Sequence, residues 1–401
     1  MNHPASEAIQ PGQAVFLGLR KAAPHGEIAR VLLAFLATAG LFYVNIMPAL
    51  VSGLVDGAGF SNRQAGMVGS SNVYGAALGA LIAVFIVKRI NWRKASYILL
   101  AGLIAMDLLS MLVHHFLPLL VMRFVHGFVG GMLVGIGFSI IARTTHPDRT
   151  FGYLLVVQFG LGGVGLMLLP PLVPVLGTGV LFGSLILFSL ATLLMVPFLT
   201  DYPMDLVTRP AIVGEPGIQR GPLALGLLAT FLFQAGNMAV YAYVIGLGQA
   251  AGLSMEFISP TLAAAAWIGI VGSGLVIILP TRLGRSLPLG AAILVTAVAT
   301  WALNYSDVSL VYIAANCIVG VTWAFGIPYL LGMCAQFDKA GQMAALGGFA
   351  SKMGLASGPM IAALVVGASN YALVINLGAA MLVICLLAAF VPMRLLDRSR
   401  A

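Results

Sequence analysis

Long apolar stretches separated by short polar connections run along almost the whole chain. A helix needs about 20 predominantly apolar residues to cross a bilayer, and most of these stretches reach that length. The pattern therefore predicts an all-α membrane protein. Its twelve expected transmembrane segments span residues 28–53, 64–87, 95–113, 118–142, 151–173, 178–200, 222–249, 259–279, 287–305, 308–334, 343–368 and 371–393.

A polar, proline-containing segment divides the twelve into two groups of six. Because an even number of crossings returns the chain to its starting side, both termini are expected on the same side of the membrane. The predicted organisation is a cytoplasmic N-terminal tail (1–27), a six-helix bundle (28–200), a cytoplasmic linker (201–221), a second six-helix bundle (222–393) and a cytoplasmic tail (394–401).

The two halves carry matching residues at a constant offset. Three residues recur 193 positions later in the corresponding segment or loop: Gly79 at Gly272, Arg89 at Arg282, and Gly127 at Gly320. Three matches at one offset indicate a duplicated six-helix unit, which is a common construction of secondary transporters.

The composition agrees with a lipid environment. Of the 401 residues 60% are hydrophobic and 8% are charged, and the mean hydropathy is +1.04, which leaves too little polar surface for a water-soluble globule. The 20 lysines and arginines gather in the tails and in alternate connections, except Arg63, Arg123 and Lys352. Positive charge in cytoplasmic loops orients membrane proteins. The distribution therefore predicts the cytoplasmic (inner) membrane with both termini inside, and no nucleic-acid partner.

Two motifs resemble those of the major facilitator superfamily of secondary transporters. The stretch Arg123-Phe124-Val125-His126-Gly127-Phe128-Val129-Gly130-Gly131 is similar to the family's Arg-x-x-x-Gly-x-x-Gly-Gly pattern. The loop after the second segment of each half keeps part of the family's Gly-x-x-x-Asp-Arg-x-Gly-Arg-Lys motif, without its aspartate. The retained residues are Arg89, Arg93, Arg282, Gly284 and Arg285. The resemblance implies two pseudo-symmetric bundles around a central cavity, with these loop residues acting in conformational change.

Three ionisable residues lie close together in the predicted fold of the first half. Asp107 and Arg123 are about equally far from the turn between their segments, so they can form an ion pair within the membrane. Asp107 is the only acidic residue inside any expected segment, and His126 lies on the same helical face as Arg123. Asp107 and His126 are therefore candidates for proton coupling, and a fixed structural pair is the alternative.

Lys352 lies near the middle of its segment, where no acidic residue of that segment can neutralise it. Charged residues at this depth are expensive and usually functional. The resemblance places this segment beside the central cavity, so Lys352 and Arg123 are expected to contact an anionic substrate, most simply a carboxylate.

Polar and aromatic residues in otherwise apolar segments complete the predicted substrate site. Gln234, Asn237 and Tyr241 share one helical face. Weaker candidates are Asn45, Asn72, Tyr74, Gln158 and Asn316, and Trp267 and Trp323 offer aromatic surfaces. For each of these residues, helix packing is the alternative interpretation.

We expect a secondary transporter for a small organic anion, driven by protons and functional as a monomer in the bilayer. The alternatives are an exporter of hydrophobic or amphiphilic compounds and a transport-inactive sensor or scaffold. The sequence contains no phosphate-binding loop, nucleophile arrangement or metal-ligand cluster. We therefore expect no enzymatic activity, no cofactor and no metal.

Overall fold

The computed structural model describes residues 15–16, 19–24, 26–202, 219–278, 284–337 and 344–398. Two short antiparallel strands, β1 (Val15–Phe16) and β2 (Leu19–Arg20), precede the helices. The first half contains α1 (Glu27–Ala39), α2 (Phe42–Asn45), α3 (Met47–Ala58), α4 (Asn62–Ile86), α5 (Trp92–Met111), α6 (Phe116–Ile141), α7 (Pro147–Leu176), α8 (Gly179–Met195) and the 3-10 turn η1 (Val196–Phe198). The second half contains α9 (Arg220–Tyr241), α10 (Val244–Ala250), α11 (Met255–Ile278), α12 (Ser286–Ala302), the 3-10 turn η3 (Leu303–Tyr305), α13 (Ser309–Gln336), α14 (Ala344–Val365) and α15 (Tyr371–Arg398).

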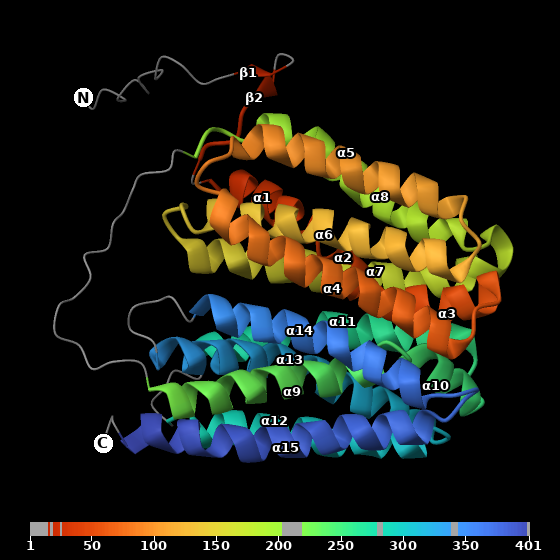
Figure 1. The fold of residues 1–401 in the computed structure, drawn as a ribbon. Helices are drawn as coiled ribbons and strands as arrows, with labels where there is room; N and C mark the ends of the chain where they lie inside the picture. The colour runs from red at the N-terminus through yellow and green to blue at the C-terminus, as the bar shows by residue number, and fades with distance from the viewer. Residues whose placement is uncertain are drawn as a thin grey trace, which may run out of the picture.

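The helices form two bundles that lie side by side (Figure 1), and they confirm the predicted fold class. Eleven helices of the described chain are long and apolar enough to cross a membrane singly. The first expected crossing is divided into α1, α2 and α3, and the seventh into α9 and α10. The sequence analysis predicted a single span at each of these two places.

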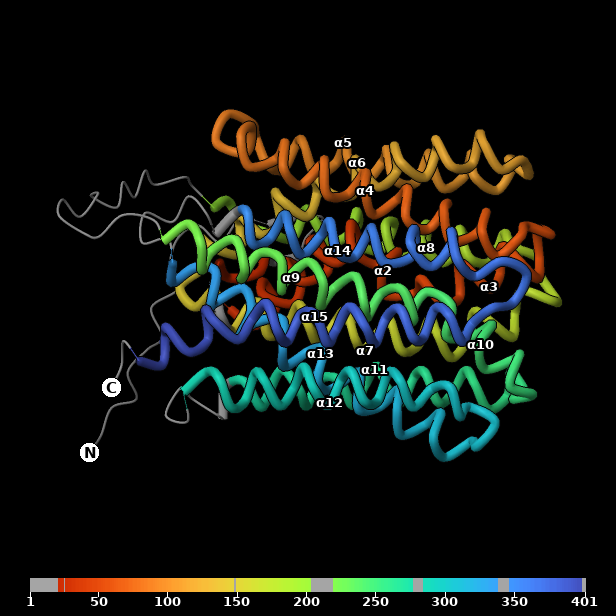
Figure 2. Tube along the Cα trace, turned by 60° about the horizontal axis from the view of Figure 1, so that its bottom comes forward, coloured from red at the N-terminus to blue at the C-terminus, as the bar shows by residue number. Residues whose placement is uncertain are grey.

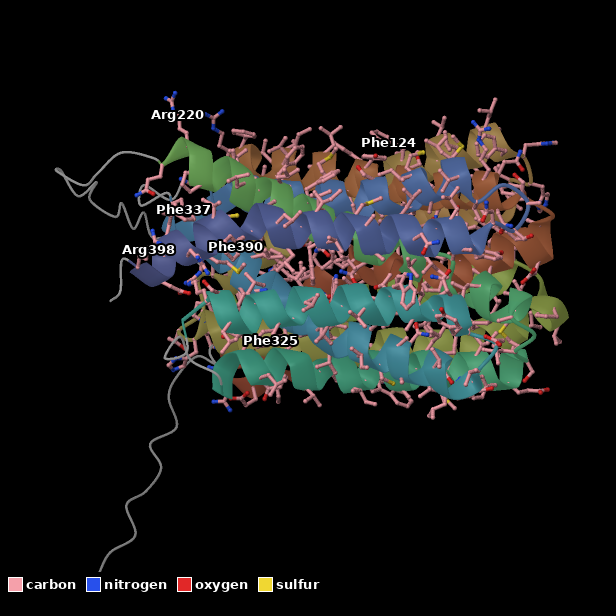
Figure 3. The ribbon with its side chains drawn as sticks, turned by 90° about the horizontal axis from the view of Figure 1, so that it is seen from below. Phe124, Arg220, Phe325, Phe337, Phe390 and Arg398 are labelled. Carbon is pink, nitrogen blue, oxygen red and sulfur yellow. The ribbon has the colours of Figure 1, made fainter. Side chains whose placement is uncertain are left out.

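All helices run along one common axis, so the molecule has two ends (Figure 2). We call the end where α1 begins and α15 ends the terminal end, and the opposite one the far end. The arginines Arg220 and Arg398 lie at the terminal end, whereas Phe124 projects from the side of the bundle (Figure 3). Large apolar side chains such as Val175 (77% exposed) and Leu187 (69% exposed) cover the lateral surface, as a lipid-facing surface requires.

Glycines at equivalent positions of the two halves make equivalent helix contacts. A Cβ atom added to Gly79 of α4 would lie 2.0 Å from the carbonyl oxygen of Phe128 in α6. One added to Gly272 of α11 would lie 2.0 Å from that of Val321 in α13. Because Phe128 and Val321 are also 193 positions apart, the same two backbone surfaces meet in both halves. The duplication inferred from sequence is therefore present in the packing.

The two bundles meet along two seams. Helix α4 packs against α14, and α7 packs against α11. These are the second and eleventh crossings and the fifth and eighth crossings, so the repeat relates the two seams to each other. The central cavity is lined by α7 and α11 of one seam and by Leu355 of α14 in the other.

Candidate functional site

A cavity of about 110 Å³ lies where the two halves meet. Its walls come from α2 and α7 of the first half and from α9, α11, α13 and α14 of the second. Six of the predicted substrate-site residues line it: Asn45, Gln158, Asn237, Tyr241, Asn316 and Trp323. The lining residues include no charged side chain. The cavity surface is mainly apolar, and its polar groups are therefore neutral.

Hydrogen bonds hold the cavity wall across the boundary between the halves. The hydroxyl of Tyr241 in α9 donates to the backbone oxygen of Asn45 in α2, at 2.7 Å. Asn45 Nδ2 in turn donates to the backbone oxygen of Gln158 in α7, at 3.2 Å. The interruption between α2 and α3 thus supplies backbone groups to the cavity wall, as broken helices do in transporters.

Gln234 lies behind the cavity rather than on its surface. Trp323 Nε1 donates to Gln234 Oε1 at 2.7 Å, and Gln234 Nε2 donates to Ser351 Oγ at 2.8 Å. The Trp323 ring also packs edge-to-face against Phe159, with ring centroids 5.8 Å apart. Gln234 therefore fixes the orientation of an aromatic ring that faces the cavity.

Trp267 occupies a different environment from Trp323. Its ring is 41% exposed, and its Nε1 donates to the backbone oxygen of Gly160 at 3.0 Å, across the seam between α7 and α11. Trp267 is not among the cavity-lining residues. The expected aromatic contribution to the cavity therefore comes from Trp323, and Trp267 joins the two halves.

Lys352 lies one turn of α14 from Leu355, which lines the cavity, and immediately after Ser351. It is partly exposed, and no hydrogen bond or ion pair to it occurs among the residues that the structure describes. The exposed apolar residues of α14, Leu346 and Leu364, lie roughly 120° around the helix from Lys352 at 3.6 residues per turn. Lys352 therefore lies off the lipid-facing stripe, on the terminal side of the cavity.

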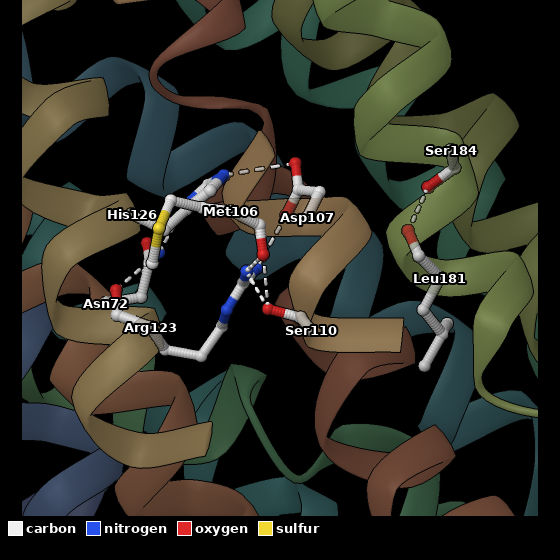
Figure 4. Close-up of polar contacts among 8 residues, drawn as sticks. All are labelled: Asn72, Met106, Asp107, Ser110, Arg123, His126, Leu181 and Ser184. Carbon is white, nitrogen blue, oxygen red and sulfur yellow. Dashed lines mark hydrogen bonds and ion pairs between the residues drawn. The ribbon is translucent and has the colours of Figure 1, made fainter. Parts of the chain in front are cut away.

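The predicted ion pair between Asp107 of α5 and Arg123 of α6 is confirmed (Figure 4). Arg123 Nη1 lies 2.7 Å from Asp107 Oδ1, and both side chains are fully buried. Arg123 Nη2 donates to the backbone oxygen of Met106 at 3.0 Å and to the hydroxyl of Ser110. The guanidinium thus has several partners within the first half.

His126 extends this cluster toward α4. Its Nε2 lies 3.2 Å from Asp107 Oδ2, and its Nδ1 lies 2.8 Å from Asn72 Nδ2. Asn72 Nδ2 also lies within hydrogen-bonding distance of the backbone oxygen of Arg123, at 3.1 Å. Because an amide nitrogen can only donate here, Nδ1 of His126 is the acceptor and Nε2–H is directed at Asp107. One carboxylate thus accepts hydrogen bonds from an arginine and a histidine.

This cluster is separate from the central cavity. The guanidinium of Arg123 lies 5.0 Å from the ring centroid of Phe182 in α8. Neither Arg123 nor Asp107 is among the cavity-lining residues. The structure therefore does not bring Arg123 and Lys352 together at one site, contrary to the arrangement expected from sequence.

The residues of the predicted conformational loops lie at the terminal end. Arg89 is exposed, and Arg282 lies outside the described residues. Arg93 Nη2 donates to the backbone oxygen of Leu199 at 2.8 Å and to Asp201 Oδ1 at 3.1 Å. These contacts attach the segment that follows α8 to the first half.

In the second half the acid missing from the loop motif is supplied by another helix. Asp397 of α15 accepts hydrogen bonds from the backbone nitrogens of Arg285 at 2.7 Å and Ser286 at 2.9 Å, at the start of α12. Gly284 precedes them with a positive φ of 71°. A carboxylate at a helix N-terminus is favourable, so Asp397 fixes this loop. The sequence analysis did not identify Asp397.

The described hydrogen bonds between the two halves lie at the cavity or between the cavity and the far end. Asn62, at the start of α4, contacts three residues of the second half: its Nδ2 donates to the Ala368 oxygen, its backbone oxygen accepts from the Tyr243 hydroxyl at 3.0 Å, and its Oδ1 accepts from the Tyr371 hydroxyl at 3.4 Å. Tyr74 and Ser357 contact through their hydroxyls at 2.9 Å. Within the described ranges no such bond lies nearer the terminal end than the cavity. These contacts join the two halves at the far end.

Comparison with known proteins agrees with this architecture. A family model described as the Major Facilitator Superfamily matches residues 31–363. A mutant of the nucleoside transporter NupG aligns with a TM-score of 0.69 at 13% identity, covering 91% of this chain and 99% of that chain. The human organic anion transporter MFSD10 aligns with a TM-score of 0.64 at 16% identity, covering 92% and 100%.

No curated protein sequence matches the chain. At these identities the two solved structures establish the fold alone, whereas the family match extends over most of the chain. The chain therefore belongs to the Major Facilitator Superfamily, and it is a secondary transporter rather than an enzyme.

Proposed function

We propose that this transporter moves a small organic anion across the cytoplasmic membrane by alternating access, with both termini in the cytoplasm and protons as the coupling ion. The substrate occupies the central cavity and its terminal side, between the two halves. The two halves rock about this site, so that it opens to one side of the membrane at a time. The chain acts as a monomer, because each chain contains both halves of the cavity.

The observation that carries the proposal is the position of Lys352. An ammonium group near mid-membrane is costly unless it meets water or a counter-charge. Lys352 is without a described partner, lies off the lipid-facing stripe and borders the cavity. A carboxylate of the substrate would neutralise it. The organic anion transporter among the similar folds agrees with this substrate class, without establishing it.

The proposed proton site is the cluster of Asp107 and His126. Both groups are buried, 3.2 Å apart and outside the substrate cavity, so the same proton can move between them without contact with substrate. Arg123 holds the carboxylate in place from the other side. In this proposal protonation of the pair changes the packing of α6 against α4, and α4 forms part of a seam between the halves.

Substitution of Lys352 tests the proposal. Lys352→Met removes the charge and keeps most of the side-chain volume, so carboxylate binding should weaken by at least about tenfold because a charge-assisted hydrogen bond is lost. Lys352→Arg keeps the charge and should retain binding within a few-fold. Binding of benzoate and succinate to the purified protein is measured by isothermal titration calorimetry. Equal affinity of the wild type and Lys352→Met for every carboxylate that binds would contradict the anion assignment.

A second candidate is a transporter of uncharged polar solutes. The specific observation in its favour is the absence of charged side chains from the cavity lining. A nucleoside transporter is among the similar folds. In that case uridine or another neutral solute would bind, and Lys352→Met would leave its affinity unchanged.

A further inference from the structure

Each of three asparagines in the cavity wall donates a hydrogen bond from its side-chain amide nitrogen to a backbone oxygen. Nδ2 of Asn45 donates to the Gln158 backbone oxygen at 3.2 Å, Nδ2 of Asn237 to that of Phe233 at 2.7 Å, and Nδ2 of Asn316 to that of Tyr312 at 2.8 Å. Because a backbone oxygen only accepts, these contacts fix which amide atom is nitrogen. The remaining Oδ1 atoms are left as acceptors.

The Oδ1 atom of Asn237 is the strongest indication of a ligand. Asn237 is 95% buried and lines the cavity, and within the described chain its Oδ1 is inaccessible to solvent and without any hydrogen-bond partner. A buried acceptor without a partner costs about 1–3 kcal/mol. A donor group from a bound molecule would remove that cost. No described hydrogen bond reaches Oδ1 of Asn45 or Asn316 either.

Two single-hydrogen donors of the cavity wall are already engaged. Trp323 Nε1 donates to Gln234, and the Tyr241 hydroxyl donates to the Asn45 backbone oxygen. Among the described polar lining residues, Gln158 alone retains a side-chain amide with no hydrogen bond. Each asparagine Nδ2 keeps a second N–H, so the cavity offers both donors and acceptors. Oδ1 of Asn237, which has no partner in the described chain, is the group that specifically requires an N–H or O–H donor from a ligand.

We propose that the central cavity binds the ring of the substrate through hydrogen-bond donors on it, received by the amide oxygens of Asn237, Asn45 and Asn316. The inference rests on the proposed function in taking the cavity as the substrate site. The edge-to-face pair of Trp323 and Phe159 suits a planar ring. The volume of about 110 Å³ is smaller than the apolar cavity of about 150 Å³ that binds benzene, so the cavity holds at most a single ring.

The position of Lys352 then defines the substrate class. Lys352 and the cavity-lining Leu355 are three residues apart on α14, about 4.5 Å along the helix axis. A ring acid that carries a hydroxyl or amino group opposite its carboxylate reaches both sites at once. The carboxylate meets the ammonium group outside the cavity, and the hydroxyl or amino group lies inside it.

Matched ligands that differ in one donor test this inference. The acidic pair is 4-hydroxybenzoate and 4-methoxybenzoate, and the neutral pair is 4-hydroxyacetophenone and 4-methoxyacetophenone. Affinities for the purified full-length protein are measured by calorimetry. In each pair that binds, the hydroxyl compound should bind at least about tenfold more tightly, because the methoxy compound leaves the amide oxygen unpaired.

Two cavity variants and one control complete the experiment. Asn237→Leu and Asn316→Leu should each reduce the preference for the hydroxyl compound, Asn237→Leu to within about twofold, and either variant suffices if the other does not fold. Asn304→Leu removes an amide at the far end, outside the cavity, and should keep the full preference.

The experiment distinguishes failure of this inference from failure of the proposed anion substrate. Binding of the neutral pair with undiminished preference, together with no effect of Lys352→Met on the acidic pair, would support the inference and remove the anion assignment. An absence of hydroxyl preference in the wild type, a preference that persists in both cavity variants, or no binding of any of the four compounds would overturn the inference.

Discussion

Arg123 and Lys352 are two cations within the predicted membrane segments, and their positive charges lie in different environments. Arg123 is fully buried and pairs with Asp107 at 2.7 Å, so its charge is compensated inside one half. Lys352 is partly exposed, lies one turn from the cavity-lining Leu355 and has no described hydrogen bond or ion pair. Removing one member of a buried ion pair is strongly destabilising, whereas an uncompensated charge beside a cavity is available to a ligand. Their burial therefore assigns Arg123 to structure and leaves Lys352 as the substrate-facing cation of the proposal.

Asp107→Asn is expected to destabilise the protein by about 3–5 kcal/mol, because the guanidinium of Arg123 stays buried without its carboxylate. The double variant Asp107→Leu with Arg123→Met removes both charges and should recover much of that loss. Thermal unfolding in detergent measures both effects. Recovery of stability in the double variant indicates that the pair, and not the lone carboxylate, stabilises the fold.

Uptake measured at several pH values separates proton coupling from a structural role. If Asp107 and His126 carry the coupling proton, Asp107→Asn in liposomes loses the pH dependence of uptake even where the folded protein persists. His126→Gln keeps a donor near the carboxylate and should also lose that dependence. Uptake that retains its full pH dependence in both variants would leave the cluster as a purely structural element.

Sequence patterns predicted which types of residue line the cavity, and they predicted less well which individual side chains face it. The stripe of Asn237 and Tyr241 lines the cavity as expected, and so does Asn316. Trp267 and Trp323 are indistinguishable by residue type and surroundings, yet one joins a seam and the other lines the cavity. The difference depends on how α11 and α13 are rotated within the bundle, which is a result of tertiary packing.

At the scale of helices, the crossing of α11 and α13 allows a controlled substitution. A Cβ on Gly272 would lie 2.0 Å from the Val321 oxygen, so Gly272→Ala forces the helices apart. Overpacking of this kind costs about 1–3 kcal/mol. Gly79→Ala should cost about the same, because the equivalent distance in the first half, to the Phe128 oxygen, is also 2.0 Å.

Gly274 provides the control on the same helix. A Cβ at Gly274 would meet no atom within 4 Å, so Gly274→Ala should be neutral or slightly stabilising, given the higher helix propensity of alanine. Thermal unfolding midpoints of the three variants are compared in one detergent. Equal midpoints for Gly272→Ala and Gly274→Ala would show that α11 and α13 can move apart without loss of stability.

Helix boundaries were largely predictable from hydropathy, and two features at helix ends were not. The first expected crossing is interrupted after Ala39, and the turn there packs closely on α6, since a Cβ at Gly40 would lie 2.1 Å from the Gly130 oxygen. Likewise the loop before α12 is held by Asp397, 112 residues further along the chain than Arg285. Both features depend on contacts distant in sequence, which local patterns do not contain.

At the scale of the whole molecule, the contacts of Asn62 join the two halves at the far end. They connect the start of α4 to Tyr243 and to the connection between α14 and α15. Each hydrogen bond contributes about 0.5–1.5 kcal/mol, and two states that interconvert during transport differ by only a few kcal/mol. Loss of these contacts therefore shifts the balance between the two states rather than unfolding the protein.

The variant Asn62→Ala with Tyr243→Phe removes all three hydrogen bonds and should raise the population open at the far end by roughly tenfold. Spin labels at Ala58→Cys and Ala251→Cys, with the native cysteines replaced, report the separation of α3 and α10 by pulsed electron resonance. Asn304→Ala is the control, because Asn304 lies at the same end but bonds only within the second half. An unchanged distance distribution would show that apolar packing, such as that of Gly66 against Ala363, holds the halves together at this end without the hydrogen bonds.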